Sequence, residues 1–523
     1  MENAKQQTGV PENAFRELKK GEQYEPLMSP DRTYKEVTVW SVLWGVLMAV
    51  VFSAASAYLG LKVGQVFEAA IPITIIAIGV TGATHRKGAL GENVIIQSIG
   101  ACSGMIVAGA IFTLPALYIL QDKYPEMTVN FMEVFVASVL GGVLGILFLI
   151  PFRKYFVKDM HGKYPFPEAT ATTEVLVSGE KKGDQAKLLA CSGLIGGLYD
   201  FAVGTFGWWT ENVSTRLAEW GTLLADKAKL VFKVNTGAAV LGLGYIVGLR
   251  YAAYICAGSF TVWFVLIPFI SHFADGQTIA VGEGVTALLR DMSPEEIFRN
   301  YARHIGIGGI AMAGVVGIIR SSKIIRQALS LAVTELRGRQ TPGQETGRTQ
   351  RDLPMKLILA LLIATLLTTF VFFRFGVLDN WFHSVIAILI VFVISFLFTT
   401  VAANAIAIVG TNPVSGMTLM TLILSSLVLV SAGLTGTGGM TAAMIIGGVV
   451  CTALSMAGAF ITDLKIGYWL GTTPAKQEGW KFLGTAVSAA TVAGVLMILN
   501  QTYGFVGEGA LVAPQANAMA AVI

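Results

Sequence analysis

Long runs of the sequence carry almost no charge, and this feature limits the possible folds more than any other. Residues 38–61, 131–152 and 383–403 are examples. Each is long enough to cross the hydrocarbon core of a bilayer as a helix, which takes about 20 residues. Only 13% of the 523 residues are charged, against about 25% in ordinary soluble domains. The sequence therefore predicts an all-α polytopic membrane protein.

Basic residues are distributed unevenly between the loops, and this predicts the orientation. Lys and Arg collect in short cytoplasmic loops. The loops at 85–87 and 153–163 and the polar linker at 321–353 are basic, whereas residues 274–298 are mainly acidic. We therefore expect the N-terminus and the linker to be cytoplasmic in a multi-pass protein of the cytoplasmic (cell) membrane.

Parts of the sequence occur twice. Residues 102–113 (CSGMIVAGAIFT) match 451–462 (CTALSMAGAFIT), and residues 166–176 (FPEATATTEVL) match 513–523 (APQANAMAAVI). A third match joins the stretch from Ser56 to Thr74 with the stretch that begins at Ala403. The three pairs lie at nearly one offset, which indicates an internal duplication. An extra span at 354–375 without a first-copy partner would give the second repeat an inverted topology.

The predicted spans and the repeat together give an organisation. Further spans are expected near 66–84, 93–120, 186–206, 230–249, 252–273, 299–320, 414–433, 440–461 and 482–499. We predict a cytoplasmic N-terminal segment (1–37), a first repeat of eight spans (38–320), the linker (321–353), and the extra span with a second repeat (354–523). Because Ile523 is the counterpart of Leu176, the second repeat is expected to be truncated.

The stretch GTNPVSG at 410–416 interrupts an apolar run. Proline in a helix interior costs about 3 kcal/mol, and freed backbone groups have no water partner in lipid. A repeated break of this kind is typical of broken or re-entrant helices in secondary transporters. Amide, hydroxyl and backbone groups near the breaks are the predicted solute-binding residues: Asn404, Asn412, Pro413, Ser415, Asn93, Gln97, Gln515 and Asn517. The alternative is a kinked helix packed on its neighbours, with Asn404 and Asn412 as caps.

Acidic residues at membrane depth are candidates for proton binding, because an unpaired charge there is costly and burial raises the pKa of a carboxyl group. The candidates are Glu68, Glu92, Glu168, Glu174 and Asp200. The alternative is that each lies at the membrane surface and is solvated. Asp463 and Lys465 are expected to mark a membrane edge, with Lys476 and Lys481 in the cytoplasmic loop beyond it.

Other functional classes lack their sequence signatures. The four cysteines have no CxxC spacing and the five histidines are scattered, so we expect no metal site, disulfide or cofactor. No HExxH, nucleophile elbow or P-loop is present, which argues against an enzyme and a primary pump. A channel would need a continuous polar stripe. The net charge of +4 gives no reason to expect nucleic acid as a partner.

Segments along nearly the whole chain resemble the oligopeptide transporter (OPT) family, which includes the yellow-stripe-like branch. They are LGLKVG (59–64), ENVIIQS (92–98), AGAIFTLPAL (108–117), FPEATATTEVL (166–176), NPVSGMT (412–418), DLKIGYWLGTTPAKQ (463–477) and APQANAMA (513–520). The resemblance implies a proton-coupled symporter for short peptides or metal–chelate complexes. The sequence departs from the family at Asn93, where the family often has two adjacent asparagines, and it lacks the usual C-terminal quarter.

The sequence thus predicts a secondary active transporter that imports small oligopeptides across the bilayer and is driven by the proton gradient. A metal–chelate (siderophore-like) solute is the alternative cargo. An intramembrane enzyme is the alternative of another class, and it would need a clustered catalytic set. The sequence leaves open whether the protein is a homodimer.

Overall fold

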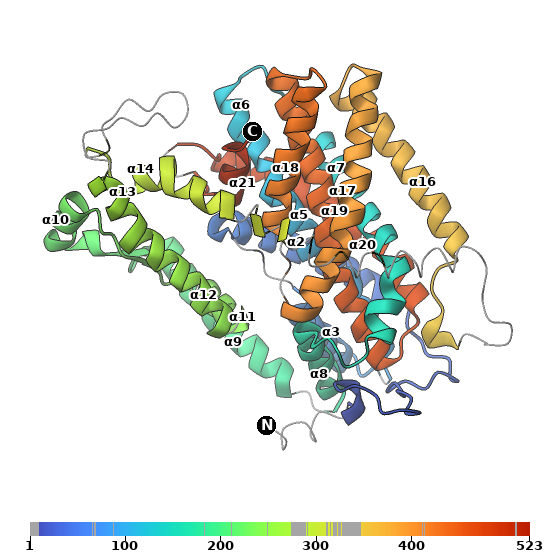
Figure 1. Ribbon diagram of the computed structural model, residues 1–523. Coiled ribbons are helices and arrows are strands. Elements are labelled where there is room, and N and C mark those ends of the chain that lie inside the picture. The colour runs from blue at the N-terminus through green and yellow to red at the C-terminus, as the bar shows by residue number, and fades with distance from the viewer. Residues whose placement is uncertain are drawn as a thin grey trace. The chain divides into compact units, whose positions relative to one another are not determined.

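A computed structural model shows the fold (Figure 1). It describes residues 10–523 apart from 65, 67–68, 87, 182–183, 211, 248, 274–288, 290, 310–311, 314, 317–318, 320–321, 323–325, 327–346, 411, 413 and 508–509. Glu68, Pro413, most of the linker and most of the acidic 274–298 stretch therefore lie outside the described residues. The chain divides into unit 1, which is Met1–Ala186 with Ala311–Ile523, and unit 2, which is Lys187–Ile310.

Unit 1 is built from helices. Its first part contains η1 (Glu12–Ala14), α2 (Val39–Val63), α3 (Ala70–Ala83), α4 (Leu90–Gly100), α5 (Cys102–Thr113), α6 (Pro115–Lys123), α7 (Phe131–Leu149), η2 (Ile150–Phe152), η3 (Lys154–Asp159) and α8 (Pro167–Lys181). Its second part contains η8 (Arg348–Gln350), α16 (Met355–Phe372), η9 (Phe373–Val377), α17 (Trp381–Val409), α18 (Val414–Ser431), α19 (Gly436–Leu470), α20 (Pro474–Thr502) and α21 (Pro514–Ala520).

Unit 2 is also mainly helical. It contains α9 (Asp184–Phe201), η4 (Ala202–Phe206), η5 (Thr215–Leu217), α10 (Glu219–Ala228), α11 (Ala238–Val247), α12 (Leu249–Phe260), η6 (Thr261–Leu266), α13 (Ile267–Phe273), α14 (Pro294–Ile297) and η7 (Phe298–Ala302). Strands β1 (Asn212–Ser214) and β2 (Lys233–Asn235) pair antiparallel. The predicted span at 230–249 is therefore wrong, because its first residues form β2 and α11 begins only at Ala238.

The prediction of an all-α polytopic membrane protein is confirmed. Within the described residues, eight helices are long and apolar enough to cross a membrane. They are Val39–Lys62, Leu90–Lys123, Phe131–Phe152, Ala252–Phe273, Arg348–Val377, Trp381–Val409, Gly436–Leu470 and Pro474–Thr502. Two further apolar helices, Ala70–Ala83 and Gly416–Ser431, are shorter than a full span.

The two sequence repeats run in opposite directions through unit 1. The segment α4–α5 and its counterpart α19 pack against each other. Gln97 bonds Asp463, Ala108 accepts a weak hydrogen bond from Cys451, and Thr113 lies near Gly447. Residue numbers rise along one segment as they fall along the other. The short helices α8 and α21, which are also counterparts, lie at opposite ends of unit 1 (Figure 1). This antiparallel packing is the arrangement expected for the predicted inverted topology.

Small residues let the helices of the two repeats approach closely at this crossing. A Cβ atom at Gly109 would collide with the backbone of Thr452, and one at Gly141 or Gly145 would collide with carbonyl oxygens of α19. Close approach through small residues is the usual way in which membrane helices gain packing energy, since lipid supplies no hydrophobic drive for helix association. Every residue of α19 from Ala442 to Leu470 is buried.

Replacing Gly109 by Ala should destabilise unit 1, because the added methyl group has no space beside Thr452. Overpacking of this kind costs about 1–3 kcal/mol. Thermal unfolding of the purified protein in detergent would measure the loss. Gly494→Ala in α20 is the control, since a Cβ atom there meets nothing within 4 Å. Equal stability of the two variants would contradict this account of the crossing.

Candidate functional site

The helix break at residues 410–416 has a counterpart with the same backbone geometry in the first repeat. Helix α2 ends at Gly64 and α17 ends at Gly410, its counterpart, and both glycines are left-handed with φ of 77° and 78°. Their N–H groups bond Gly60 O at 2.8 Å and Ile406 O at 2.9 Å. A left-handed conformation favours glycine over other residues. The two breaks are therefore one local structure formed twice.

Each break is covered by the short helix of the other repeat. The ring of Pro514, at the start of α21, occupies the space beside Gly64, and the ring of Pro167, at the start of α8, occupies the space beside Gly410. The residue before each proline, Ala513 or Phe166, is also left-handed, with φ of 35° and 40°. The sequence comparison found the two proline segments as a repeat but did not predict this crossed contact.

The crossed contact also satisfies the backbone at the helix ends. The N–H of Ala513 donates to Leu61 O, and the N–H of Phe166 donates to Ala407 O, both at 2.9 Å. Unpaired carbonyl groups at membrane depth cost several kcal/mol each. The two repeats are therefore tied together by the same pair of main-chain hydrogen bonds, one at each break.

Polar side chains lie at the second break. Asn412 donates from Nδ2 to Ser455 O at 3.1 Å. Its Oδ1 atom and that of Asn404 are buried and have no hydrogen-bond partner among the described residues. Ser415 lies in the first turn of α18, but its side chain is outside the described residues, as is Pro413. Two amide oxygens in this region are thus buried acceptors without a partner among the described residues.

The predicted amides of the C-terminal segment have different surroundings. Gln515 donates from Nε2 to Gly64 O in a long hydrogen bond of 3.5 Å, so it belongs to the first break. Asn517 donates to Val512 O at 2.9 Å and to Ala513 O at 3.3 Å. The Nδ2 group of Asn517 therefore stabilises the turn that precedes α21.

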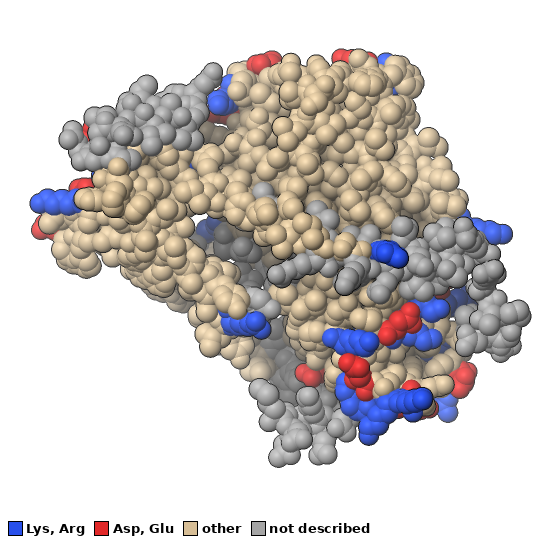
Figure 2. Space-filling model, viewed as in Figure 1, with Lys and Arg blue, Asp and Glu red and all other residues tan. Residues whose placement is uncertain are grey.

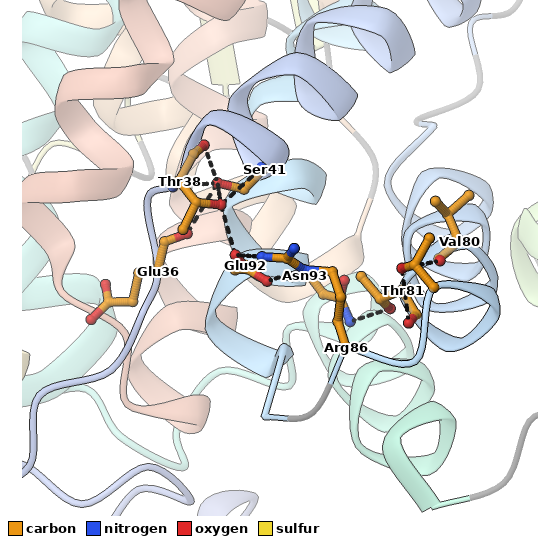
Figure 3. A network of polar contacts seen from close by, with 9 residues as sticks. Glu36, Thr38, Ser41, Val80, Thr81, Arg86, Glu92 and Asn93 are labelled. Carbon is orange, nitrogen blue, oxygen red and sulfur yellow. Dashed lines mark hydrogen bonds and ion pairs between the residues drawn. The ribbon is translucent and has the colours of Figure 1, made fainter.

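Glu92 and Asn93 start α4 and belong to a polar network (Figure 3). The Glu92 carboxylate accepts hydrogen bonds from Arg86 at 2.6 and 3.0 Å and from Thr38 Oγ1 at 2.7 Å. Asn93 donates to Thr81 Oγ1 at 3.3 Å. Thr38 also caps α2. The contacts of Glu92 therefore hold the starts of α2 and α4 together and favour its ionised form.

The other carboxylate candidates are dispersed. Glu168 follows Pro167 at the second break, and Glu174 lies two turns further along α8; both side chains are half-buried. Asp200 lies in unit 2 and accepts a hydrogen bond from Ala238 N at the start of α11. Glu68 is outside the described residues. Among the described carboxylate candidates, Glu168 is the one whose neighbour in sequence contacts a helix break.

A buried ion pair that was not expected from the sequence lies in the second repeat and contacts α4 of the first repeat. Asp463 in α19 pairs with Lys481 in α20, and Gln97 Nε2 donates to Asp463 Oδ1 at 2.7 Å. Lys481 also donates to Ser98 O at 2.7 Å. At most 1% of either charged side chain is exposed. Asp463 is therefore paired inside the protein and not solvated, and Lys481 lies in α20 and not in a loop.

In the described part of unit 1, the position that matches Asp463 at the opposite end carries no charge. The residue that aligns with Asp463 in the first repeat is Leu114, whose side chain packs on Gly448. The framework is thus symmetric in its backbone but has a buried charged contact between α4 and α19–α20 at one end only.

Lys465 is also buried, and it lies near the second break. Its Nζ donates to Val157 O at 2.8 Å and lies 5.5, 4.8 and 5.0 Å from the ring centres of Phe166, Tyr468 and Trp469. Desolvated cation–π contacts contribute about 2 kcal/mol or more. Aromatic rings therefore stabilise this ammonium group next to the segment that covers Gly410.

The N-terminal strap, residues 10–36, lies over the end of α19. Trp469 Nε1 donates to Ala14 O at 3.0 Å, Tyr24 Oη donates to Trp469 O at 2.7 Å, and Met28 N donates to Leu470 O at 2.9 Å. Glu36, at the end of the strap, is fully buried and bonds Arg348 at 2.8 Å. The strap thus joins α19 to the start of the second part of unit 1, a role that the sequence did not indicate.

His161 fixes the strap from the other side. It is buried, with Nε2 2.8 Å from Asn13 O and Nδ1 3.1 Å from Tyr468 Oη. Because Asn13 O can only accept, Nε2 carries the proton and, in the neutral ring, Nδ1 accepts from Tyr468. Burial lowers the pKa of His161 below its usual value of 6.5, and the nearby charge of Lys465 acts in the same direction.

Comparisons with known proteins agree with this architecture. The family model described as "OPT oligopeptide transporter protein" matches residues 36–523. A curated protein of Haemophilus influenzae (strain Rd), named "Putative oligopeptide transporter", is 29% identical over 497 residues. That match covers 89% of this chain and 74% of the Haemophilus protein. The family match includes the two breaks and the ion pair.

Replacing Lys481 by Met should strongly destabilise the protein, because Asp463 would remain buried without its cation. Breaking a buried pair from one side costs about 3–5 kcal/mol, whereas replacing both partners by apolar residues is often neutral. The double variant Asp463→Leu/Lys481→Met should therefore regain most of the stability in detergent unfolding.

The matched control is Lys476→Met, whose side chain is 40% exposed and lies 3.5 Å from Glu36. It should cost less than about 1 kcal/mol. A Lys481→Met protein as stable as this control would rule out the ion pair as a structural contact.

The strap should loosen as the pH falls. Because the pKa of His161 is lowered in the folded protein, its contribution is complete above about pH 6.5 and is lost as the pH falls below that value. Glu22 stays ionised in this range, since its hydrogen bond with Arg16 lowers its pKa to about 2. After correction for the pH dependence of intrinsic amide exchange, residues 10–28 should be less protected from hydrogen exchange at about pH 5.5 than at about pH 7.5. His161→Gln should remove the difference; an unchanged difference in that variant would assign it to another group.

Proposed function

Because the chain belongs to the OPT oligopeptide transporter family and is thus a membrane transporter, we propose that it is a proton-coupled symporter that imports small oligopeptides. Inverted repeats with paired broken helices are typical of secondary transporters, in which solute and coupling ion bind near the breaks. The crossed contact at Gly64 and Gly410 is the observation that supports this proposal most. Family membership argues against the intramembrane enzyme.

The solute site in this proposal lies at the second break. The unpaired amide oxygens of Asn404 and Asn412 suit the N–H groups of a short peptide, and the broken helix end supplies further main-chain groups. A metal–chelate rich in carboxylates offers few such donors, so the observed acceptors favour a peptide. Among the described residues, no group of three or more His, Cys, Asp or Glu is placed to bind a bare metal ion.

We place the end of unit 1 that holds the strap in the cytoplasm of a cell whose plasma membrane carries the protein. On the face shown in Figure 2, Lys and Arg side chains gather at this end with Asp and Glu, and the belt above them is mostly uncharged. Arg153, Arg348 and Lys476 belong to this end through their contacts with Asp352 and Glu36. Basic residues are enriched on the cytoplasmic side of membrane proteins.

Asn412→Ala should weaken uptake of labelled di- to pentapeptides into proteoliposomes. Loss of an amide that contacts a buried solute costs about 1–3 kcal/mol, which corresponds to about 5- to 150-fold in apparent affinity. Uptake by the wild-type protein should rise when an inward proton gradient is imposed. Gradient-independent uptake would exclude symport, and transport of ferric chelates in place of peptides would favour the alternative cargo.

Asn380→Ala is the matched control for this experiment. Asn380 lies at the opposite end of α17, where its side chain accepts a hydrogen bond from Phe382 N. This variant removes an amide from the same helix and should leave the apparent peptide affinity unchanged. If Asn412→Ala behaves in the same way, Asn412 is not a solute contact.

A further inference from the structure

Glu168 and Gln515 occupy the same position in the two crossed contacts. Each follows the proline that covers a helix break, Pro167 at Gly410 and Pro514 at Gly64. The preceding main-chain hydrogen bonds have equal length, 2.9 Å. Gln515 uses this position to donate a hydrogen bond to Gly64 O, the carbonyl at the end of α2. By the symmetry of the repeat, the equivalent contact of the Glu168 carboxyl group would be with Gly410 O, the carbonyl at the end of α17.

The two side chains have nearly the same shape but differ in one chemical property. The amide of glutamine always has N–H donors, whereas a carboxyl group can donate only while it is protonated. An ionised Glu168 would instead bring a negative charge towards the negative end of the α17 dipole, where anions are disfavoured. The protonation state of Glu168 therefore controls whether the second break can form the hydrogen bond seen at the first.

We propose that Glu168 is the proton-binding residue of the transporter and that its protonated carboxyl group closes the second break by donating a hydrogen bond to Gly410 O. This inference rests on the proposed proton-coupled function. The proton adds to a carboxylate oxygen from the outer solution, is held in the hydrogen bond while the break is closed, and leaves to the inner solution when the break opens. No other bond is made or broken.

Titratable groups near Glu168 lie on α8 and on the helices packed against it. Helix α8 packs on α3, α4, α17 and α19. Helix α3 has no titratable residue, Glu92 of α4 is paired with Arg86, and Asp463 of α19 is paired with Lys481. His383 lies at the far end of α17, bonded to Ala432 O. Lys465 of α19 contacts the Phe166 ring, and Glu174 is on α8 itself.

Glu168→Gln is the decisive variant, because it copies Gln515, the residue at the same position in the second repeat. In proteoliposomes it should lose all gradient-driven accumulation of peptide, while exchange of labelled for unlabelled peptide continues and no longer depends on pH. Glu174→Gln is the matched control on the same helix and should retain accumulation. Accumulation by Glu168→Gln equal to that of the wild type would overturn the proposal.

The reverse variant, Gln515→Glu, tests the same hydrogen bond at the first break. Its peptide exchange should fall as the pH rises and recover on acidification, measured without a gradient. A pH dependence of exchange no steeper than that of the wild-type protein would contradict the mechanism, even if Glu168→Gln did not fold. If the wild-type protein shows no response to a proton gradient but Gln515→Glu exchange titrates, the symport function fails and the protonation-dependent contact stands.

Discussion

The need to satisfy every backbone polar group inside a bilayer governs this structure. Two spans end within unit 1 at Gly64 and Gly410, and lipid offers no partner for the carbonyl groups left there. The protein supplies those partners from the opposite repeat, through the N–H groups of Ala513 and Phe166. Each repeat therefore completes the other, and the interruption in the apolar sequence becomes a contact between the two halves of the fold.

The backbone framework is symmetric, but the side chains differ between the two ends of unit 1 and between the two breaks. The strap end has a buried Asp463–Lys481 pair and a covering N-terminal segment, whereas the matching position at the other end is the apolar Leu114. An inverted-repeat transporter can adopt two conformations, each open to one side of the membrane. Contacts that differ between its two ends set which of these conformations has the lower free energy. The two breaks also differ in a side chain: Gln515 follows the proline that covers Gly64, whereas Glu168 follows the proline that covers Gly410.

Part of the candidate site could be predicted from the sequence. Asn412 and Glu168 stand out because polar groups are costly in apolar segments, whatever their partners are. Asp463 was misjudged for the same reason: a charge near the end of an apolar run is normally solvated at the membrane surface. Its cation, Lys481, lies beyond a turn, and Gln97 is hundreds of residues away. Only packing brings the three side chains together.

The sequence by itself determined the membrane environment, the helical class, the family, the duplication and the positions of the breaks, because hydrophobicity, proline, glycine and repetition act locally along the chain. Only the tertiary structure decided what each break contacts, which charges are paired and where the strap lies. Those outcomes depend on distances between segments that are far apart in sequence. Inversion of one repeat against the other sets these distances, and it places Pro514 on Gly64 and Pro167 on Gly410.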